Sequence, residues 1–202
     1  MSGNYQRNTQ TQNEEALWIK DFLRGKTGSF DKLVLKYQDA VFRLCFHMTG
    51  NDADADDCAQ ETFIKAYKGL RGFKFRSAFS TWLYRIAINT CKSMVASPAY
   101  RFRQHAVSVD ANPGGEEGLA PLQIPNHRTP ELLLAQKETM KAILKAISSL
   151  PQKYKVPVVL YDMEGKSYED ISRITGLKMG TIKSRLARAR QFLRRKLKGV
   201  AK

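Results

Sequence analysis

The chain has 202 residues and carries 34 lysines and arginines against 19 aspartates and glutamates, which gives a formal net charge of +15. So large an excess of cations indicates a polyanionic partner, either a nucleic acid or an anionic membrane surface. No apolar run approaches the roughly 20 residues that cross a bilayer, and residues 1–13 hold no apolar signal core. We therefore expect a cytoplasmic protein without membrane insertion.

Cysteine and histidine usage gives little support to a metal centre. The three cysteines, Cys45, Cys58 and Cys91, are far apart in the sequence and form no CxxC pair. We expect buried free thiols in a reducing compartment rather than disulfides or zinc. The three histidines are equally scattered, so we predict no metal and no cofactor.

The first part of the chain has helical spacing and no strand pattern. Residues 1–13 are rich in Gln, Asn and Thr, which predicts a disordered tail. Leu17 and Phe22 are expected to face inward from the helix that follows. Three helices are predicted, over 14–24, 30–48 and 53–70.

Four aspartates cluster at the start of the third helix, where negative charge is favoured by the helix dipole. Calcium is an alternative, because Asp52, Asp54 and Asp56 have the spacing of the first ligands in an EF-hand loop. That loop needs Gly where Asp57 lies and Glu where Phe63 lies, so we reject calcium.

Residues 73–92 (FKFRSAFSTWLYRIAINTCK) are rich in aromatics and cations. A helix is predicted from Ser80, whose side chain suits an N-cap. Four residues recur on one face at three- to four-residue steps: Trp82, Arg85, Asn89 and Lys92. Rings can stack on unpaired bases, cations can hold phosphates and an asparagine can hydrogen-bond a base edge. From these residues alone, a strand-binding face and an aromatic core beside solvated cations are equally open.

Residues 97–129 are interrupted by prolines and glycines, which exclude a long helix or strand. A stretch of about 33 residues is too long for an ordinary connection within a compact domain. We predict a flexible linker that separates an all-α domain over 14–96 from a second one over 130–198.

The second domain ends in a helix-turn-helix pattern. Two helices are predicted first, over 130–150 and 152–163. Ser167 and Asp170 then form a capping box that opens a short helix. Gly176 supplies a left-handed turn, and a longer basic helix begins near Gly180. A capped short helix, a glycine turn and a basic helix together predict a duplex-DNA reader.

From Lys178 to the end of the sequence there are ten cations and no acid. Lys183, Ser184, Arg188 and Arg190 leave the apolar stripe of the last helix near the end that enters the major groove, where arginine can pair with guanine. A membrane-binding or calmodulin-binding helix is an alternative, but the capped helix and turn before it argue against that. The other alternative is that these cations only form the solvated end of a helix and bind nothing.

Four motifs carry a resemblance to bacterial RNA polymerase sigma factors of the extracytoplasmic-function (ECF) type. They read DADADDCAQETFIKAYKGLRGF (52–73), SAFSTWLYRIAINTCKS (77–93), SLPQKYKVPVVLYDMEGKSYEDIS (149–172) and GTIKSRLARARQFLRRKL (180–197). The resemblance implies an all-α fold of two small helical domains, a sigma-2-like bundle over 14–96 and a sigma-4-like helix-turn-helix domain over 130–198, joined by the linker over 97–129.

The resemblance also implies roles for particular residues. Contacts to the β′ clamp helices of core RNA polymerase would come from Asp57, Gln60, Glu61 and Phe63. Reading and melting of the −10 element would involve Phe73, Ser80, Trp82, Arg85, Asn89 and Lys92. Contacts to the −35 element would come from Thr181, Lys183, Ser184, Arg185, Arg188 and Arg190. The partners implied are core polymerase, through its β′ and β subunits, promoter DNA and an anti-sigma factor.

One departure from the family pattern affects the −10 loop. Phe75 and Arg76 stand where many members have Gly and an acid. Phenylalanine cannot adopt positive φ as cheaply as glycine, so the loop's shape and preferred base remain open.

The function implied is promoter-specific initiation without catalysis by this chain. The alternatives are a stand-alone helix-turn-helix regulator and, more remotely, a metal-dependent nuclease that uses Asp52 to Asp57.

Overall fold

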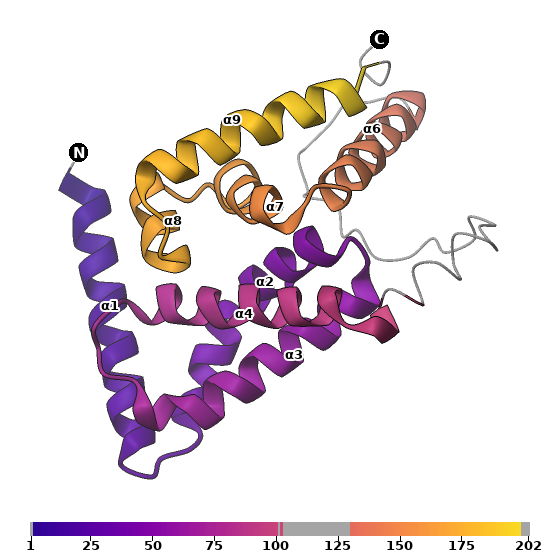
Figure 1. Ribbon diagram of the computed structural model, residues 1–202. Helices are drawn as coiled ribbons and strands as arrows, with labels where there is room; N and C mark the ends of the chain where they lie inside the picture. The colour runs from indigo at the N-terminus through magenta and orange to yellow at the C-terminus, as the bar shows by residue number, and fades with distance from the viewer. Residues whose placement is uncertain (1, 101, 103–129, 199–202) are drawn as a thin grey trace.

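The computed structural model describes residues 2–100, 102 and 130–198, and all regular secondary structure within these residues is helical (Figure 1). The linker predicted over 97–129 lies mostly outside the described residues. The elements are α1 (Ser2–Leu23), α2 (Ser29–Thr49), α3 (Asp52–Gly69), the 3-10 turn η1 (Leu70–Gly72), α4 (Phe79–Ala96), α6 (Pro130–Ser148), α7 (Gln152–Val158), the π-helical turn η2 (Val159–Met163), α8 (Tyr168–Thr175) and α9 (Met179–Lys196).

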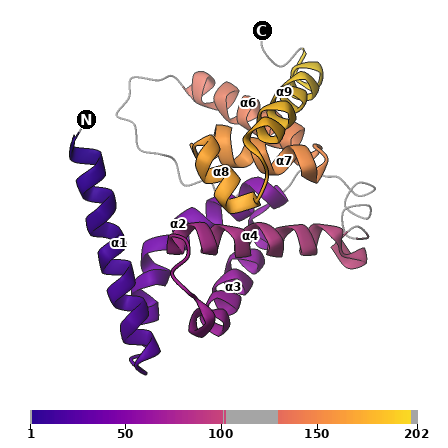
Figure 2. The same ribbon diagram turned by 60° about the vertical axis from the view of Figure 1, so that its left-hand side comes forward.

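Helices α1 to α4 form the N-terminal half. Helices α2, α3 and α4 pack on one another, and α1 packs beside α2 at the edge of this group (Figures 1 and 2). Leu33, Leu44 and Leu83 are fully buried at the centre. Gly50 ends α2 in the left-handed conformation with φ of 91°, which glycine adopts without a steric cost. Asn51 then caps α3 by accepting the Asp54 N–H at 2.8 Å.

Two predictions for this half are wrong at helix ends. Helix α1 begins at Ser2, so residues 2–13 are helical where composition indicated disorder. A helix already nucleated by packing extends more easily than it forms alone, which lets a polar, proline-free segment continue it. Helix α4 begins at Phe79 after Ala78, so Ser80 lies inside the first turn and is not the N-cap.

The inward face of α1 also differs from the prediction. Phe22 is buried as expected, but Leu17 is 56% exposed and Ile19 is buried instead. Both residues are apolar, so the helical spacing of α1 alone could not decide which of them faces α2.

The C-terminal half contains the predicted helix-turn-helix. Ser167 caps α8 by accepting the Asp170 N–H, Gly176 turns the chain with φ of 74°, and α9 follows. The helix predicted over 152–163 changes to π-helical geometry at Val159, two residues after Pro157. Proline has no N–H to donate, so the helix loses a regular hydrogen bond there.

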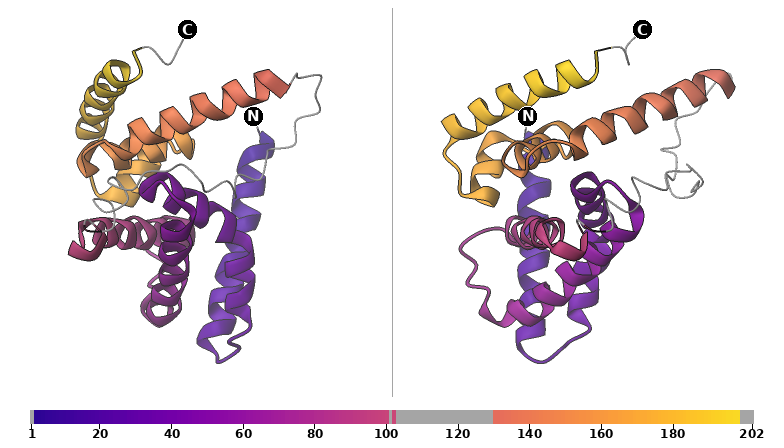
Figure 3. Two further views of the ribbon diagram at one scale, coloured as in Figure 1. Left: turned by 90° about the vertical axis from the view of Figure 1, so that its right-hand side faces the viewer. Right: turned by 45° about the vertical axis from the view of Figure 1, so that its right-hand side comes forward.

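The two halves pack against each other through polar and apolar contacts. Helix α8 lies on α4, and α6 and η2 lie on α2 (Figure 3). Lys155 of α7 is 3% exposed and donates to the Met48 carbonyl at 3.2 Å. His47 Nδ1 lies 3.1 Å from Glu164 Oε1. Helix α9 lies on the side of the C-terminal half that is remote from α4 (Figures 1 and 3).

No helix among the described residues is long and apolar enough to span a bilayer.

Candidate nucleic-acid interface

An aromatic cluster forms where η1 leads into α4. Phe73, Phe79 and Trp82 lie with ring centroids 5.2 to 6.2 Å apart, and Phe75 adds a fourth ring 5.0 Å from Phe73. Phe73, predicted to meet bases directly, is only 8% exposed and packs against the core. In this arrangement Phe73 can support a base site as part of its wall.

Phe75 adopts a backbone conformation that phenylalanine rarely takes. Its φ is 53°, and it is the one non-glycine residue with positive φ in the described part of the chain. Such a conformation costs on the order of 1 kcal/mol or more and persists only when the surroundings enforce it. The loop therefore contains a left-handed turn at Phe75, although this conformation costs phenylalanine more than glycine.

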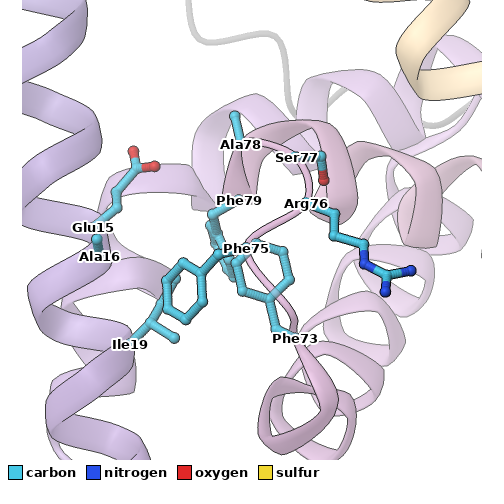
Figure 4. A pocket seen from close by; sticks show the side chains of 9 residues that line it. All are labelled: Glu15, Ala16, Ile19, Phe73, Phe75, Arg76, Ser77, Ala78 and Phe79. Carbon is cyan, nitrogen blue, oxygen red and sulfur yellow. The ribbon is translucent and has the colours of Figure 1, made fainter.

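A cavity of about 280 Å³ opens between this loop and α1 (Figure 4). Figure 4 shows the Phe75 ring beside Ile19, with Arg76 pointing away from α1. The lining residues are Glu15, Ala16, Ile19, Phe73, Phe75, Arg76, Ser77, Ala78 and Phe79. The walls combine aromatic faces with a few polar groups, a composition that suits a planar ligand.

Glu15 places a carboxylate in this cavity, although it is 4% exposed. Lys36 Nζ lies 2.6 Å from Glu15 Oε1, and the Tyr37 hydroxyl donates to the same oxygen. Burial, followed by the hydrogen bond to Glu15, raises the pKa of Tyr37 far above its ordinary value, so its hydroxyl stays protonated and donates. The Lys36 cation, through an ion pair, and the Tyr37 hydroxyl, through a hydrogen bond, together offset the charge of this buried acid.

The predicted −10 face of α4 lies opposite α8. Arg85, Asn89 and Lys92 are exposed along one side of α4, as their spacing predicted. Arg85 is engaged, however: its Nε donates to the Ile174 carbonyl at 3.2 Å and its Nη2 to the Arg173 carbonyl at 2.5 Å. These are end carbonyls of α8, which favour a cation.

The same three residues line a second cavity of about 300 Å³, together with Ile88, Ile174, Thr175 and Gly176. Lys166 adds a contact between the halves, with its Nζ 4.4 Å from the centroid of the Tyr84 ring. The N-terminal half therefore presents its basic face toward the helix-turn-helix in this arrangement. Ser80 and Trp82 are half-buried at the start of α4.

The predicted polymerase-binding residues lie on the exposed face of α3 with one exception. Asp57, Gln60 and Glu61 are exposed, whereas Phe63 is partly buried and packs on the core. Ile64 is 46% exposed on the same face, four residues after Gln60. Sequence reasoning missed Ile64, although an apolar residue spaced with polar neighbours on one helix face was a usable signal.

The predicted −35 residues line α9 on its solvent side. Lys183, Ser184, Arg188 and Arg190 are exposed, while Thr181 and Arg185 are half-buried. The exposed set matches the prediction from the apolar stripe, whose buried members include Ile182, Leu186 and Ala189. The contact of Arg190 with Asp162 Oδ1, at 2.6 Å, was not predicted, because Asp162 lies 28 residues earlier.

The three cysteines are free and buried in the N-terminal half, as predicted. Hydrogen bonds with Cys58 and Cys91, together with burial, raise the pKa of Cys45 far above its ordinary range. Within the described ranges, no group of three or more His, Cys, Asp or Glu side chains is arranged to hold a metal ion.

These features define a helical protein with a basic, aromatic-flanked helix in one half and a helix-turn-helix in the other. Comparison with known families assigns both halves: the Sigma-70 region 2 family matches residues 33–101, and the Sigma-70, region 4 family matches residues 140–193. The chain belongs to the ECF sigma factors of the sigma-70 family.

Similarity to curated relatives extends over most of the chain. This chain is 35% identical to the RNA polymerase sigma-H factor of Pseudomonas aeruginosa, over 91% of this chain and 93% of the relative. This chain is 36% identical to the ECF sigma-E factor of Escherichia coli K12, over 86% of this chain and 89% of the relative. It is 34% identical to SigW of Bacillus subtilis, over 90% and 96%.

Solved structures share the fold. CnrH, in complex with the cytosolic domain of CnrY, matches with a TM-score of 0.63 at 22% identity, over 92% of this chain and 97% of that one. The sigma factor RpoE of Bartonella quintana, in complex with the anti-sigma factor NepR, matches with a TM-score of 0.56 at 25% identity, over 85% and 98%.

The chain is therefore a sigma factor that directs promoter-specific transcription initiation through core RNA polymerase. It is an initiation factor and not an enzyme. A stand-alone regulator would not require the region 2 family over the N-terminal half, so this alternative and the nuclease hypothesis are set aside.

Proposed function

We propose that α4 and the aromatic cluster hold the separated −10 strand and that α9 reads the −35 duplex. One observation carries this assignment: Arg85, Asn89 and Lys92 form an exposed row that is continuous with the aromatic cluster. Cations can neutralise strand phosphates along such a row, while the amide of Asn89 is free to pair with a base edge.

The cavity beside Phe75 is the proposed site for a base rotated out of the strand. Its volume of about 280 Å³ is near the small end of the range for ligand pockets, which suits one planar group. Removing a base from its stack costs a few kcal/mol per step. Contacts with aromatic rings return about 1–3 kcal/mol per base, and the hydroxyl of Ser77 and the carboxylate of Glu15 can add hydrogen bonds.

Core polymerase would bind the exposed face of α3. Asp57, Gln60 and Glu61 supply polar contacts there for the β′ subunit, and Ile64 adds an apolar one between them. Phe63 would act from beneath by packing this face on the core. The β subunit and an anti-sigma factor are further proposed partners, the latter because the similar RpoE chain is bound to one. We also propose a cytoplasmic location, because core polymerase and promoter DNA are the proposed partners.

Both DNA elements can be engaged only after the two halves separate. Elements named −10 and −35 lie roughly 25 base-pair steps apart, or on the order of 80 Å at about 3.4 Å per step. Here α4 and α8 are in direct contact through Arg85. Binding of core polymerase and promoter must therefore release Arg85 from the α8 carbonyls, which frees the same guanidinium for strand phosphate.

Run-off transcription with core polymerase on a library of promoter sequences tests the assignment and returns both elements. Asn89→Ala is expected to preserve binding to core polymerase and to lower open-complex formation on the selected promoter. Permanganate reactivity of unpaired thymines measures that step. If the variant opens the promoter as well as the wild type does, Asn89 has no role in strand binding.

A further inference from the structure

Three residues outside α9 hold two of its cations. Tyr161 and Tyr168 are stacked, with ring centroids 4.8 Å apart and planes at 22°. Lys183 Nζ lies 5.7 Å from the centroid of the Tyr168 ring, and Arg190 Cζ lies 5.4 Å from that of Tyr161. Arg190 also donates to Asp162 Oδ1 at 2.6 Å. We call these five residues the tyrosine ladder.

The ladder follows one flank of the recognition helix. Lys183 and Arg190 are seven residues apart, about two helical turns, so they project in nearly the same direction. Each directly follows a buried residue, Ile182 and Ala189, which places both cations at the edge of the buried stripe. Arg188 lies farther round the helix toward solvent.

Asp162 changes what Arg190 can do at a DNA surface. The side chain of Arg190 is 49% exposed, so a polyanion can reach it, but its guanidinium is fixed by a carboxylate on one side and a ring below. An unrestrained arginine can bind any phosphate within reach, and such contacts carry no sequence information. A neighbouring carboxylate repels phosphate oxygens unless the guanidinium lies between the two. A phosphate that approaches Arg190 from any other direction is therefore bound less well.

We propose that Asp162 is a specificity-determining positioning residue for the upstream duplex. It holds Arg190 on Tyr161, limits this cation to one approach and thereby lowers affinity for unrelated DNA. The inference rests on the proposed role of α9 in reading the −35 element. The ladder places one acid beside a helix whose every charged residue is a cation.

The test measures binding of reconstituted holoenzyme to two labelled duplexes over a range of salt concentrations. One duplex carries the upstream element returned by the promoter library, and the other has the same composition in scrambled order. Asp162→Asn is expected to raise affinity for the scrambled duplex about two- to tenfold, within the coupling range of residues in contact. The slope of log affinity against log salt should steepen by about one phosphate contact.

Three further variants make the result specific to the Asp162–Arg190 pair. In an Arg190→Ala background, Asp162→Asn should change neither the discrimination nor the slope. Asp162→Glu, which keeps the carboxylate, should retain most of the discrimination. Glu169→Gln removes the same charge from an exposed position on α8 and should behave as the wild type.

The possible failures are distinguishable. If Asp162→Asn acts equally in the presence and absence of Arg190, or no more than Glu169→Gln, Asp162 is not a positioning residue for Arg190. If the wild-type holoenzyme does not discriminate between the duplexes, the proposed role of α9 fails and this inference fails with it.

Discussion

Lys155 provides a prediction whose size follows from the structure. Its ammonium group is buried between the two halves, 3.2 Å from the Met48 carbonyl. Burial lowers the pKa of Lys155 from 10.5 to about 8, and Cys91 opposes this shift weakly. Because the charged form loses solvation on folding, folding becomes coupled to the release of a proton.

The sign and magnitude follow from linkage. Between pH 8 and pH 10.5 the unfolded chain binds a proton at Lys155 that the folded chain has lost, so stability rises with pH in this window. Below pH 8 both states are protonated and the contribution is constant. The full effect is about 3 kcal/mol, at 1.36 kcal/mol per pKa unit, and about 2 kcal/mol of it is gained by pH 9.5.

The assay compares wild type with Lys155→Met by denaturant unfolding at pH 7.5 and pH 9.5. The difference in unfolding free energy should move by about 2 kcal/mol in favour of the wild type at the higher pH. Burial also raises the pKa of Tyr84, to about 12, but Tyr84 is common to both proteins and its contribution cancels. Lys153→Met, which changes an exposed lysine of the same helix, is the matched control.

One result would refute the reasoning. If the difference between wild type and Lys155→Met stays constant with pH within about 0.5 kcal/mol, the ammonium is solvated in the folded protein. The packing of the two halves around Lys155 would then be wrong for the protein in solution.

Two further predictions concern the elements that are proposed to meet DNA. Arg85→Ala removes two hydrogen bonds to α8 carbonyls, and at roughly 1 kcal/mol for each this should shift the balance between packed and separated halves by about thirtyfold. Energy transfer between dyes on α3 and α9 measures the shift, with Lys92→Ala as the control, and an unchanged distance distribution would exclude Arg85 as a latch. Arg188→Ala should weaken binding to the selected upstream duplex by about 1–3 kcal/mol, as for loss of a bidentate base contact. Equal loss on scrambled duplex in an equilibrium binding assay would make Arg188 a phosphate contact instead.

Local sequence signals were sufficient where the interactions themselves are local. The capping box at Ser167, the left-handed turn at Gly176 and the start of α9 depend on residues within a few positions of one another. The apolar stripe of α9 likewise fixed which of its side chains are exposed, since a helix face follows from the 3.6-residue period alone. These parts of the fold, and the exposed face of α9, were predictable.

The predictions that failed depended on competition between distant elements. Ile19 rather than Leu17 turns inward on α1, because the position of α2 decides between two equally apolar side chains. Spacing within one helix does not contain this information.

The sequence by itself thus determined the helices, the helix-turn-helix and the basic faces of α4 and α9, because period, capping and composition act within single elements. The sigma-factor family came instead from the resemblance of four motifs and their order. Only the tertiary structure decided what those faces meet. Arg85 reaches carbonyls 88 and 89 residues later, and Arg190 pairs with an acid 28 residues earlier. Such pairs form only when packing brings separate helices together, so the partners of these cations could be found in the folded chain alone.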